Sequence, residues 1–325
     1  MKCTVCEGGR IELCDSEALT ATYGYCVFEI KAAGICGSDI PRVFGGASYF
    51  YPIVLGHEFS GVVKDSTNPE LIGKRASVFP ILPCMECEFC KKQQWASCKS
   101  YDYYGSRRDG GMQSLLLVKE TNLVFLPDNV SFEEGAMTEP CAVCLHAVKK
   151  ANISKGDSVL VYGAGTIGLL CGMWARALGA GAVYFSDPDE SRCNMAQELG
   201  FEVYGGQKIN TVIEASGAGA ALNDAIERCE PFGTIVLVGH GKKDTVIPHG
   251  LFVKILRKQL TITGSWNSDR NDENDDWSDS IIAMSQGKID PKRLITHKIP
   301  LECSDKAFRI IGEGKEFYNK IMVVM

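Results

Sequence analysis

Four closely spaced cysteines constrain how this chain can fold more than any other feature of its sequence. Cys84, Cys87, Cys90 and Cys98 form the pattern C-x2-C-x2-C-x7-C. Tetrahedral zinc takes four thiolate ligands, and cysteines two residues apart on a tight loop can turn their sulfur atoms toward one centre. The spacing therefore predicts a closed structural zinc site. The alternatives are four unrelated buried thiols or a thioredoxin-type redox pair, although a redox motif needs only one Cys-x-x-Cys pair beside a βαβ unit.

The composition of the whole chain is that of an intracellular enzyme. Its 325 residues are enough for two domains, and its net charge of −6 gives no electrostatic reason to bind nucleic acid. The 15 cysteines, with no signal-peptide pattern in residues 1–14, favour reduced thiols. The apolar stretch 158–185 contains Arg176 and several glycines, which favours strand, turn and helix over a membrane span. We therefore expect a cytoplasmic protein without nucleic-acid or membrane partners.

The segment 158–178 predicts a dinucleotide-binding turn. A short β-branched run leads directly into a G-x-G-x-x-G sequence formed by Gly163, Gly165 and Gly168, and an apolar segment of helical length follows. The first glycine permits the tight turn, the second lets the backbone approach a pyrophosphate, and the third lets the helix pack on the strand. The N-terminus of the helix then presents N–H groups and a positive dipole end to the phosphates. The alternative is a glycine turn that binds no nucleotide.

An acidic residue at the end of the next predicted strand, 182–186, favours NAD as the dinucleotide. Asp187 follows Gly168 by 19 positions, where a carboxylate can accept hydrogen bonds from the adenosine ribose hydroxyls. Asp187 also repels a 2′-phosphate, so we expect NAD rather than NADP, with Arg192 beside the adenine. The remaining expected cofactor contacts are Thr166, Ile167, Val238, Ser265 and Trp266.

Further strand and helix patterns extend this region into a doubly wound parallel sheet. Strands are predicted at 211–215, 234–238 and 260–263, with helical segments at 220–229 and 250–257. The result is an α/β chain in which residues 143–267 form a nucleotide-binding domain. Segments 1–142 and 268–325 would together form one catalytic domain.

The nucleotide domain is short of residues after its second predicted helix, 189–200. Only residues 201–210 separate that helix from the next strand, whereas a parallel crossover needs about a dozen residues for itself. We therefore predict that the third strand is vestigial or missing and that its crossover helix is absent. The adenosine pocket should then be more open, and Asp187 and Arg192 would contribute more of the NAD affinity.

A second metal site can be assembled from three separate segments. Cys36 supplies a thiolate in a glycine turn, His57 supplies an imidazole beside the carboxylate of Glu58, and Glu139 lies just before the nucleotide domain. A zinc ion held by one Cys, one His and one Glu keeps a position open for water or substrate, as catalytic zinc sites do. Each residue also has an ordinary alternative: a buried thiol, a core histidine or a helix-capping glutamate.

The order of these motifs resembles that of the zinc-containing medium-chain alcohol dehydrogenases, most of all their polyol dehydrogenase branch. The resemblance covers essentially the whole chain, and it rests on Cys36-Gly-x-Asp39, Gly56-His57-Glu58, the four-cysteine cluster, Glu139-Pro140 and the nucleotide turn. It implies a GroES-like, mainly β catalytic domain and a Rossmann domain, with two zinc ions and NAD per chain, in a homodimer or homotetramer. It also implies that Cys36, His57 and Glu139 hold the catalytic zinc, that Glu58 is an exchangeable or outer ligand, and that Ser38 passes on the substrate's proton.

Two adjacent arginines suggest a phosphorylated substrate. Arg107 and Arg108 lie in a glycine-flanked loop, and a guanidinium suits a phosphate through two parallel hydrogen bonds. Alternatively both brace the loop, since Arg108 precedes Asp109. The leading hypothesis is a zinc-dependent dehydrogenase that transfers a hydride from a secondary hydroxyl of a sugar-alcohol phosphate to NAD. A free polyol, a 2,3-diol or threonine is the alternative substrate, and a non-catalytic protein that binds zinc and nucleotide is the alternative class.

Overall fold

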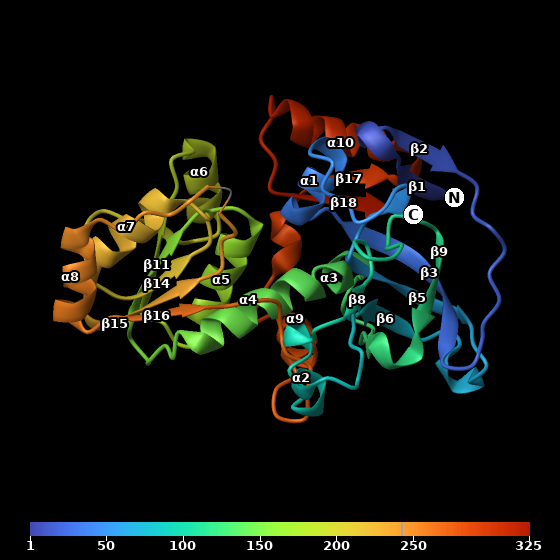
Figure 1. Ribbon diagram of the computed structural model, residues 1–325, viewed down its shortest axis with the longest axis horizontal. Coiled ribbons are helices and arrows are strands. Elements are labelled where there is room, and N and C mark those ends of the chain that lie inside the picture. Colours follow the sequence, from blue (N-terminus) through green and yellow to red (C-terminus); the bar gives the residue numbers. More distant parts are fainter. Residues whose placement is uncertain (242) are drawn as a thin grey trace. The chain divides into compact units, whose positions relative to one another are not determined.

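The computed structural model describes residues 1–241 and 243–325, and the chain divides into two compact units. The first unit comprises Met1–Glu139 and Asp269–Met325, so segments far apart in the sequence build it together. The second unit is the continuous segment Pro140–Ser268. In Figure 1 the first unit contains the blue, cyan and red parts of the ribbon, and the second contains the yellow and orange parts.

A mostly antiparallel sheet forms the framework of the first unit. Its strands are β3 (Tyr25–Gly34), β5 (Glu58–Asp65), β6 (Arg75–Val78), β9 (Leu115–Lys119), β10 (Leu123–Phe125), β17 (Ile295–Pro300) and β18 (Lys320–Val324). The order is β10-β6-β5-β3-β18-β17, and β9 also pairs with β3. Only the β17–β18 pair among these described strands is parallel.

The two central strands, β3 and β5, bring distant segments to one end of this sheet. Most of their side chains are buried, and Phe28 and Phe59 make an edge-to-face contact in the core. The antiparallel register places Gly34 opposite Glu58 on one side of β3 and opposite Met322 on the other. The turn after Gly34, the start of β5 and the start of β18 therefore meet, which positions the site described below.

Two small sheets and short helices complete the first unit (Figure 1). One sheet has the order β2 (Ile11–Cys14), β1 (Lys2–Val5), β4 (Ile53–Val54), and the other pairs β7 (Ile81–Leu82) with β8 (Asp102–Tyr103). The helices are α1 (Ile40–Phe44), α2 (Glu88–Lys91), α3 (Phe132–Ala136), α9 (Asp276–Ser285) and α10 (Ser304–Glu313). Helix α4 (Thr138–Lys150) begins in the first unit and continues into the second.

The second unit is a parallel sheet flanked by helices. Its strands are β11 (Ser158–Tyr162), β12 (Ala182–Ser186), β13 (Glu202–Val203), β14 (Ile209–Glu214), β15 (Cys229–Leu237) and β16 (Thr261–Gly264). Its helices are α5 (Thr166–Ala177), α6 (Glu190–Glu198), α7 (Gly219–Arg228) and α8 (His249–Lys258). The strand order β13-β12-β11-β14-β15-β16 is that of the doubly wound nucleotide-binding fold. The predicted fold of this segment is therefore confirmed, with α5 beginning three residues before the apolar segment that suggested it.

The third strand of this sheet is vestigial, as its short segment predicts. β13 has two residues, and they pair with Tyr184 and Phe185 of β12. The chain then turns at once: Gly206 has a φ of 101°, and the side chain of Gln207 accepts a hydrogen bond from the N–H of Gly205 at 2.8 Å. Residues 204–208, all described, contain no helix before β14 begins.

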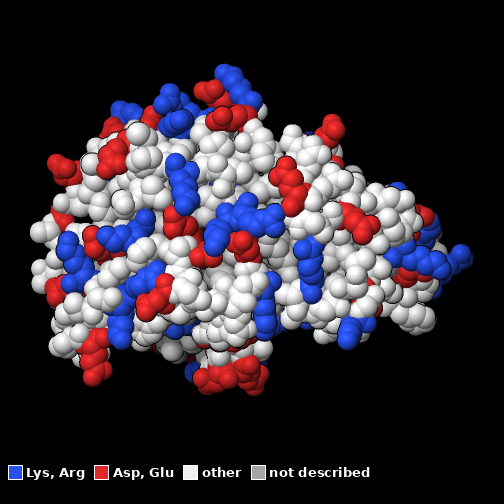
Figure 2. Space-filling view, turned by 180° about the vertical axis from the view of Figure 1, so that it is seen from behind, with Lys and Arg blue, Asp and Glu red and all other residues white. Residues whose placement is uncertain are grey.

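The described helices are also too short or too polar to cross a membrane. On the face shown in Figure 2, basic and acidic side chains alternate, and neither sign covers a large continuous area.

Candidate active site and metal centres

The four predicted zinc cysteines come together in the loop between β7 and β8. Their sulfur atoms all lie within 4.8 Å of one another, with Cys84 3.8 Å and Cys87 3.6 Å from the sulfur of Cys90. Four thiolates about 2.3 Å from a zinc ion at the centre of a tetrahedron lie about 3.8 Å apart. The cluster therefore has the size and the ligand chemistry of a structural zinc site.

The backbone of this loop favours thiolates before any metal binds. Met85 adopts a left-handed conformation with a φ of 63°. Hydrogen bonds from the backbone N–H groups of Glu86 and Cys87 lower the pKa of Cys84 to about 6. Burial has the opposite effect on Cys90 and raises its pKa to about 12, so a cation is needed to bring all four thiols into the ligand form.

The cysteine loop is attached to the start of α9 by polar and aromatic contacts. Gln93 donates from Nε2 to Asp272 at 2.6 Å and accepts from the N–H of Asp272 at 2.9 Å. The ring of Phe79 packs against Trp95 and, edge to face, against the buried Trp277. These contacts attach the four-cysteine loop to the rest of the first unit.

A second cluster of metal-binding side chains forms where β3 and β5 meet. The ligand atoms of Cys36, His57 and Glu58 lie within 4.8 Å of one another. Cys36 begins a 3-10 turn, Gly37–Asp39, immediately after β3, and Glu58 opens β5. The pairing of Gly34 with Glu58 explains why residues about 20 positions apart in sequence converge here.

Glu139 lies beside this cluster, in the first turn of α4. It is 6% exposed, and its Oε1 accepts a hydrogen bond from the hydroxyl of Tyr103 at 3.3 Å. The ring of Tyr103 lies 5.6 Å from that of His57. Burial raises the pKa of Glu139 to about 8, and the nearby charges of Glu58 and Cys36 act in the same direction. Glu139 is thus a neighbour of the cluster but not part of the group within 4.8 Å, and its binding to zinc stays a prediction.

Glu58 is held by a lysine that sequence reasoning missed. Lys320, at the start of β18, donates from Nζ to both carboxylate oxygens of Glu58, at 2.8 and 2.6 Å, and to the carbonyl of Ile35 at 3.1 Å. Both charged side chains are buried. In the sequence, the only sign of this contact is a lysine at the start of an otherwise apolar strand, and it does not indicate which residue the lysine binds.

A buried aspartate faces the imidazole of His57. Asp39 accepts the N–H of Cys36 with Oδ2 at 3.0 Å, while its Oδ1 lies 3.7 Å from Nδ1 of His57. Oδ1 and Nδ1 are both buried and have no hydrogen-bond partner among the described residues. A metal ion on Nε2 would favour a proton on Nδ1 and draw the two together, as carboxylates do behind metal-bound histidines. These unpaired atoms and the donor set Cys, His and Glu fit a zinc ion.

The remaining predicted residues of this region have defined contacts. Ser38 is exposed, and Nη1 of Arg42 lies 3.5 Å from its hydroxyl oxygen. Arg107 stacks on Tyr101, with its guanidinium carbon 4.0 Å from the ring centre, and donates to the carbonyl of Tyr101 at 2.6 Å.

Arg108 differs from Arg107 in its partner. It forms an ion pair with Asp102 at 3.3 Å and lies over the buried ring of Tyr104. Both arginines therefore brace their own loop, and phosphate binding by either one stays a prediction.

The glycine turn of the second unit has the geometry that its sequence predicts. Gly163 has a φ of 90°, and a Cβ atom on Gly168 would overlap the carbonyl oxygen of Gly163. Gly165 is the N-cap of α5 and, being glycine, has no side chain of its own to cap the helix. Thr166 and Ile167 form the first turn. The N-terminus of this 12-residue helix is consequently suited to bind a pyrophosphate.

Asp187 and Arg192 lie next to this turn. The Asp187 carboxylate accepts hydrogen bonds from the N–H of Ala164 at 2.8 Å and of Asp189 at 2.9 Å. Arg192 approaches the turn so closely that a Cβ on Gly165 would lie 2.9 Å from its Nη1. The structure thus brings Arg192 to the glycine turn, and its predicted contact with the adenine stays a prediction.

Val238, Ser265 and Trp266 follow the carboxyl ends of β15 and β16. Because the sheet is parallel, these ends share an edge with Gly163 and Asp187. The N–H of Ser265 donates to the carbonyl of Leu237 at 2.9 Å, whereas its buried hydroxyl has no partner among the described residues. Trp266 is 63% exposed.

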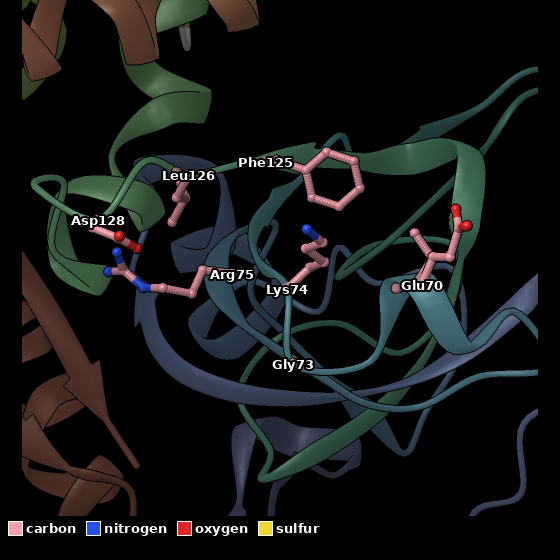
Figure 3. Close-up of a pocket in the computed structure, with 8 residues that line it drawn as sticks. Glu70, Gly73, Lys74, Arg75, Phe125, Leu126 and Asp128 are labelled. Atoms are coloured by element: carbon pink, nitrogen blue, oxygen red, sulfur yellow. The ribbon is translucent and has the colours of Figure 1, made fainter.

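A surface cavity of about 840 Å³ in the first unit is not part of these sites (Figure 3). It is lined by Glu70, Leu71, Gly73, Lys74, Arg75, Phe125, Leu126 and Asp128. Arg75 uses its guanidinium to bind the carbonyls of Pro127 and Val130 and to cover the ring of Phe132. None of the predicted catalytic residues lines it, and the guanidinium of Arg75 is occupied by the surrounding loops.

Comparison with known proteins agrees with this set of sites. The alcohol dehydrogenase GroES-like domain matches residues 23–128, and the zinc-binding dehydrogenase model matches residues 201–285. Galactitol 1-phosphate 5-dehydrogenase of Escherichia coli K12 is 33% identical over 309 residues, 88% of each chain. The chain belongs to the zinc-containing medium-chain alcohol dehydrogenases. Members of this family are oxidoreductases, and the family predicted from the sequence is confirmed.

Two further relatives fit the same family and its fold. Sorbitol dehydrogenase 1 of Saccharomyces cerevisiae S288c is 32% identical over 92% of this chain and 90% of its own. The crystal structure of galactitol-1-phosphate dehydrogenase from Escherichia coli superposes with a TM-score of 0.93 at 30% identity, covering 100% of this chain and 99% of that one. The predicted combination of a GroES-like domain and a Rossmann domain is thereby confirmed for this dehydrogenase.

Proposed function

We propose that this medium-chain dehydrogenase oxidises a secondary hydroxyl of a sugar-alcohol phosphate with NAD, with galactitol 1-phosphate to tagatose 6-phosphate as the leading case. The observation that carries the proposal is the cluster of Cys36, His57 and Glu58, with Glu139 beside it. Thiolate, imidazole and carboxylate together are a typical ligand set for catalytic zinc. The four-cysteine loop would hold a second, structural zinc ion.

Zinc would polarise the substrate hydroxyl as a Lewis acid, and the nicotinamide of NAD would accept the hydride. Cys36, His57 through Nε2, and Glu139 would hold the zinc, while Lys320 binds Glu58, which would be an exchangeable fourth ligand. Ser38 is exposed beside the cluster, so its hydroxyl can take the proton that the substrate loses and pass it to water.

NAD would bind along the carboxyl edge of the parallel sheet. The N-terminus of α5 would receive the pyrophosphate, and Asp187 would accept hydrogen bonds from the ribose hydroxyls. The carboxylate of Asp187 is fixed by the N–H groups of Ala164 and Asp189, and its charge would repel the 2′-phosphate of NADP. This fixed negative charge supports the choice of NAD.

The substrate class rests on two kinds of support. The E. coli relative at 33% identity is a dehydrogenase of galactitol 1-phosphate, and the yeast relative at 32% identity is a sorbitol dehydrogenase. A polyol is therefore common to both, and the phosphate is the finer part of the proposal. A free polyol of the sorbitol type is the second candidate.

The test is a panel of NAD-linked oxidations. NADH formation would be followed with galactitol 1-phosphate, galactitol, sorbitol, 2,3-butanediol and threonine, each with and without a zinc chelator. We expect the highest kcat/KM with galactitol 1-phosphate and loss of activity after chelation. A preference for sorbitol would favour the second candidate, and turnover that survives complete removal of zinc would contradict the proposed mechanism.

We also propose that the chain forms a homodimer or homotetramer. Helix α8 packs Leu251 and Ile255 against the core of the second unit, while Phe252 and Leu256 on its other side are 51% and 62% exposed. Trp266 is exposed as well, after the edge strand β16. Exposed apolar groups beside an unpaired strand edge suit contact with a second copy.

A further inference from the structure

We propose that Arg42 binds the anionic group of the substrate. This inference rests on the proposed function and assigns the phosphate to a residue that the sequence did not single out. Arg42 lies in α1, one turn after Ser38. Its Nη1 donates to the carbonyl of Ser38 at 2.5 Å and lies 3.6 Å from Oδ1 of Asp39.

The position of Arg42 is fixed relative to the zinc cluster. Ser38 and Asp39 belong to the turn that begins at Cys36, so the guanidinium contacts the same turn that supplies a zinc ligand. On the other side, the hydroxyl of Tyr51 donates to the carbonyl of Arg42 at 2.7 Å. The side chain is 16% exposed, so little of the freedom of a surface arginine remains to be lost on binding.

One edge of this guanidinium has no hydrogen-bond acceptor among the described residues. All its hydrogen bonds to described residues come from Nη1. Nε is buried and has no acceptor among the described residues. The Nε–Nη2 edge of an arginine presents two parallel N–H groups that match two oxygens of a phosphate. A buried donor without an acceptor is the element that an incoming anion would satisfy.

Arg107 and Arg108 do not share this property. Arg107 donates to the carbonyl of Tyr101 and lies between the rings of Tyr101 and Tyr49. Arg108 already has the carboxylate of Asp102 as an ion-pair partner. The rings of Tyr101 and Tyr103 link Arg107 to His57, whereas Arg42 contacts the Cys36 turn directly. Arg42 is therefore the arginine that we assign to the phosphate of a substrate whose hydroxyl is at the zinc.

The decisive experiment compares Arg42→Gln with Arg10→Gln in the zinc-loaded enzyme. Arg10 is 73% exposed and pairs with Glu12 on the surface, so its replacement is a matched control. Galactitol 1-phosphate and galactitol serve as paired substrates. We expect Arg42→Gln to raise KM at least tenfold more for galactitol 1-phosphate than for galactitol, and Arg10→Gln to change neither. Variants Arg107→Gln and Arg108→Gln are measured in parallel.

Two outcomes would overturn the inference while the proposed function stands. An equal loss of kcat with both substrates would mean that Arg42 only positions Ser38. A selective loss for galactitol 1-phosphate in Arg107→Gln or Arg108→Gln, but not in Arg42→Gln, would assign the phosphate to the loop arginines.

A binding measurement separates this inference from the proposed function. Inorganic phosphate should raise the thermal unfolding temperature of the unaltered protein and of Arg10→Gln, but not that of Arg42→Gln. This result would support the anion site even if no polyol were oxidised, in which case the proposed function alone would fail. An equal shift in all three proteins, or no shift in the unaltered protein, would overturn the anion site.

Discussion

The two glutamates near His57 each have a different hydrogen-bond donor. Glu58 is bound by the ammonium of Lys320, and Glu139 accepts from the phenol of Tyr103. Glu58 and Lys320 form a buried ion pair. Removing one partner of a buried pair costs far more free energy of unfolding than removing one partner of a surface pair. The donor to Glu139 is a single neutral group, so little offsets the cost of ionising the buried carboxyl group of Glu139.

Lys320→Met should destabilise the protein strongly, because it leaves the buried charge of Glu58 without a partner. We expect the free energy of unfolding to fall by about 3–5 kcal/mol, the usual cost of breaking a buried pair. Lys298→Met is the control, since Lys298 pairs with Glu133 at the surface and should cost at most about 1 kcal/mol. Urea unfolding of the metal-free proteins measures both. Similar losses in the two variants would show that the buried pair contributes no more to the free energy of unfolding than the surface pair does.

Zinc uptake should release protons from this site at pH 7. In the metal-free protein burial raises the pKa of Glu139 to about 8 and that of Cys36 to about 11, so both groups carry protons at pH 7 and must lose them to bind zinc. Zinc affinity should therefore rise with pH toward 8 and beyond. Calorimetric titration in two buffers of different ionisation enthalpy counts the protons released.

The same shift has a consequence for the metal-free protein. A carboxyl group whose pKa is higher in the folded state stabilises the fold at low pH and loses this contribution as the pH rises from about 4.5 to 8. Glu139→Gln should remove that slope and reduce the number of protons released. Unchanged proton release in this variant would exclude Glu139 as a ligand.

The residues of the site were predictable to the extent that their sequence neighbours define them. Cys84 and its partners follow from spacing alone, and Cys36 and His57 from their glycine-flanked motifs. Lys320 could not be found this way, because 262 residues separate it from Glu58 and only the register of β3 with β18 joins them. Tyr103 was missed for a similar reason, since its partner Glu139 is 36 residues away on another element.

At the scale of elements, the cysteine loop and the glycine turn are both tight turns whose N–H groups converge. In the first, N–H groups point at the sulfur of Cys84, and in the second they form the N-terminus of α5, where we propose that the pyrophosphate of NAD binds. Their strands and helices followed from apolar runs and glycines because the central parallel strands are buried on both faces. The two-residue β13 followed from chain length alone, whereas the contact of Arg192 with the glycine turn depends on the rotation of α6, which no local pattern fixes.

Cys98→Ser should reduce the zinc content from two ions per chain to one and lower the thermal unfolding temperature. Three thiolates bind zinc less well than four, and the binding energy of a structural zinc ion contributes to folding. Hydride transfer should remain detectable, because Cys98 is outside the Cys36 cluster. Cys303→Ser, which alters an exposed cysteine outside both clusters, is the control. Atomic absorption and thermal unfolding measure the effect, and unchanged zinc content would rule out the structural site.

Replacing Asp187 should change the choice of cofactor. Asp187→Asn keeps an oxygen that can accept the N–H of Ala164 but removes the charge, whereas Asp187→Ala removes both. We expect both variants to bind NAD more weakly and to accept NADP better, with Asp187→Ala losing more NAD affinity because the turn also loses its brace. KM values for the two cofactors decide the point. A preference for NADP in the unaltered protein would contradict the ribose argument.

At the scale of the whole molecule, α8 has exposed apolar side chains on the face opposite to the one that packs on the core of the second unit. Phe252 and Leu256 are four residues apart and therefore share one face of α8. Burying a leucine side chain contributes roughly 1.5–3 kcal/mol, so a few such residues suffice to change an association equilibrium. Neither the composition nor the motifs of the chain indicated which surface would make this contact.

Leu256→Glu should shift the protein toward the monomer. A charge at the centre of an apolar contact would have to be buried without a partner, which disfavours association. Ile72→Glu is the control, because Ile72 is a comparably exposed apolar residue, at 47%, in the first unit. Light scattering after size-exclusion chromatography gives the mass of each variant. If the unaltered protein is a monomer, the proposed oligomer is refuted. If the unaltered protein and both variants have the same mass, equal to that of a dimer or larger, the interface lies elsewhere.

The pairing of β18 with β3 has a consequence for how the protein is made. During synthesis the ribosome must add 262 residues after Glu58 before Lys320 exists, which at 5–20 residues per second takes roughly 13–52 s. The whole second unit, Pro140–Ser268, leaves the ribosome within that interval. The unit that is started first is thus completed last, and the nascent chain can fold its nucleotide-binding half while the zinc-binding half still lacks a strand.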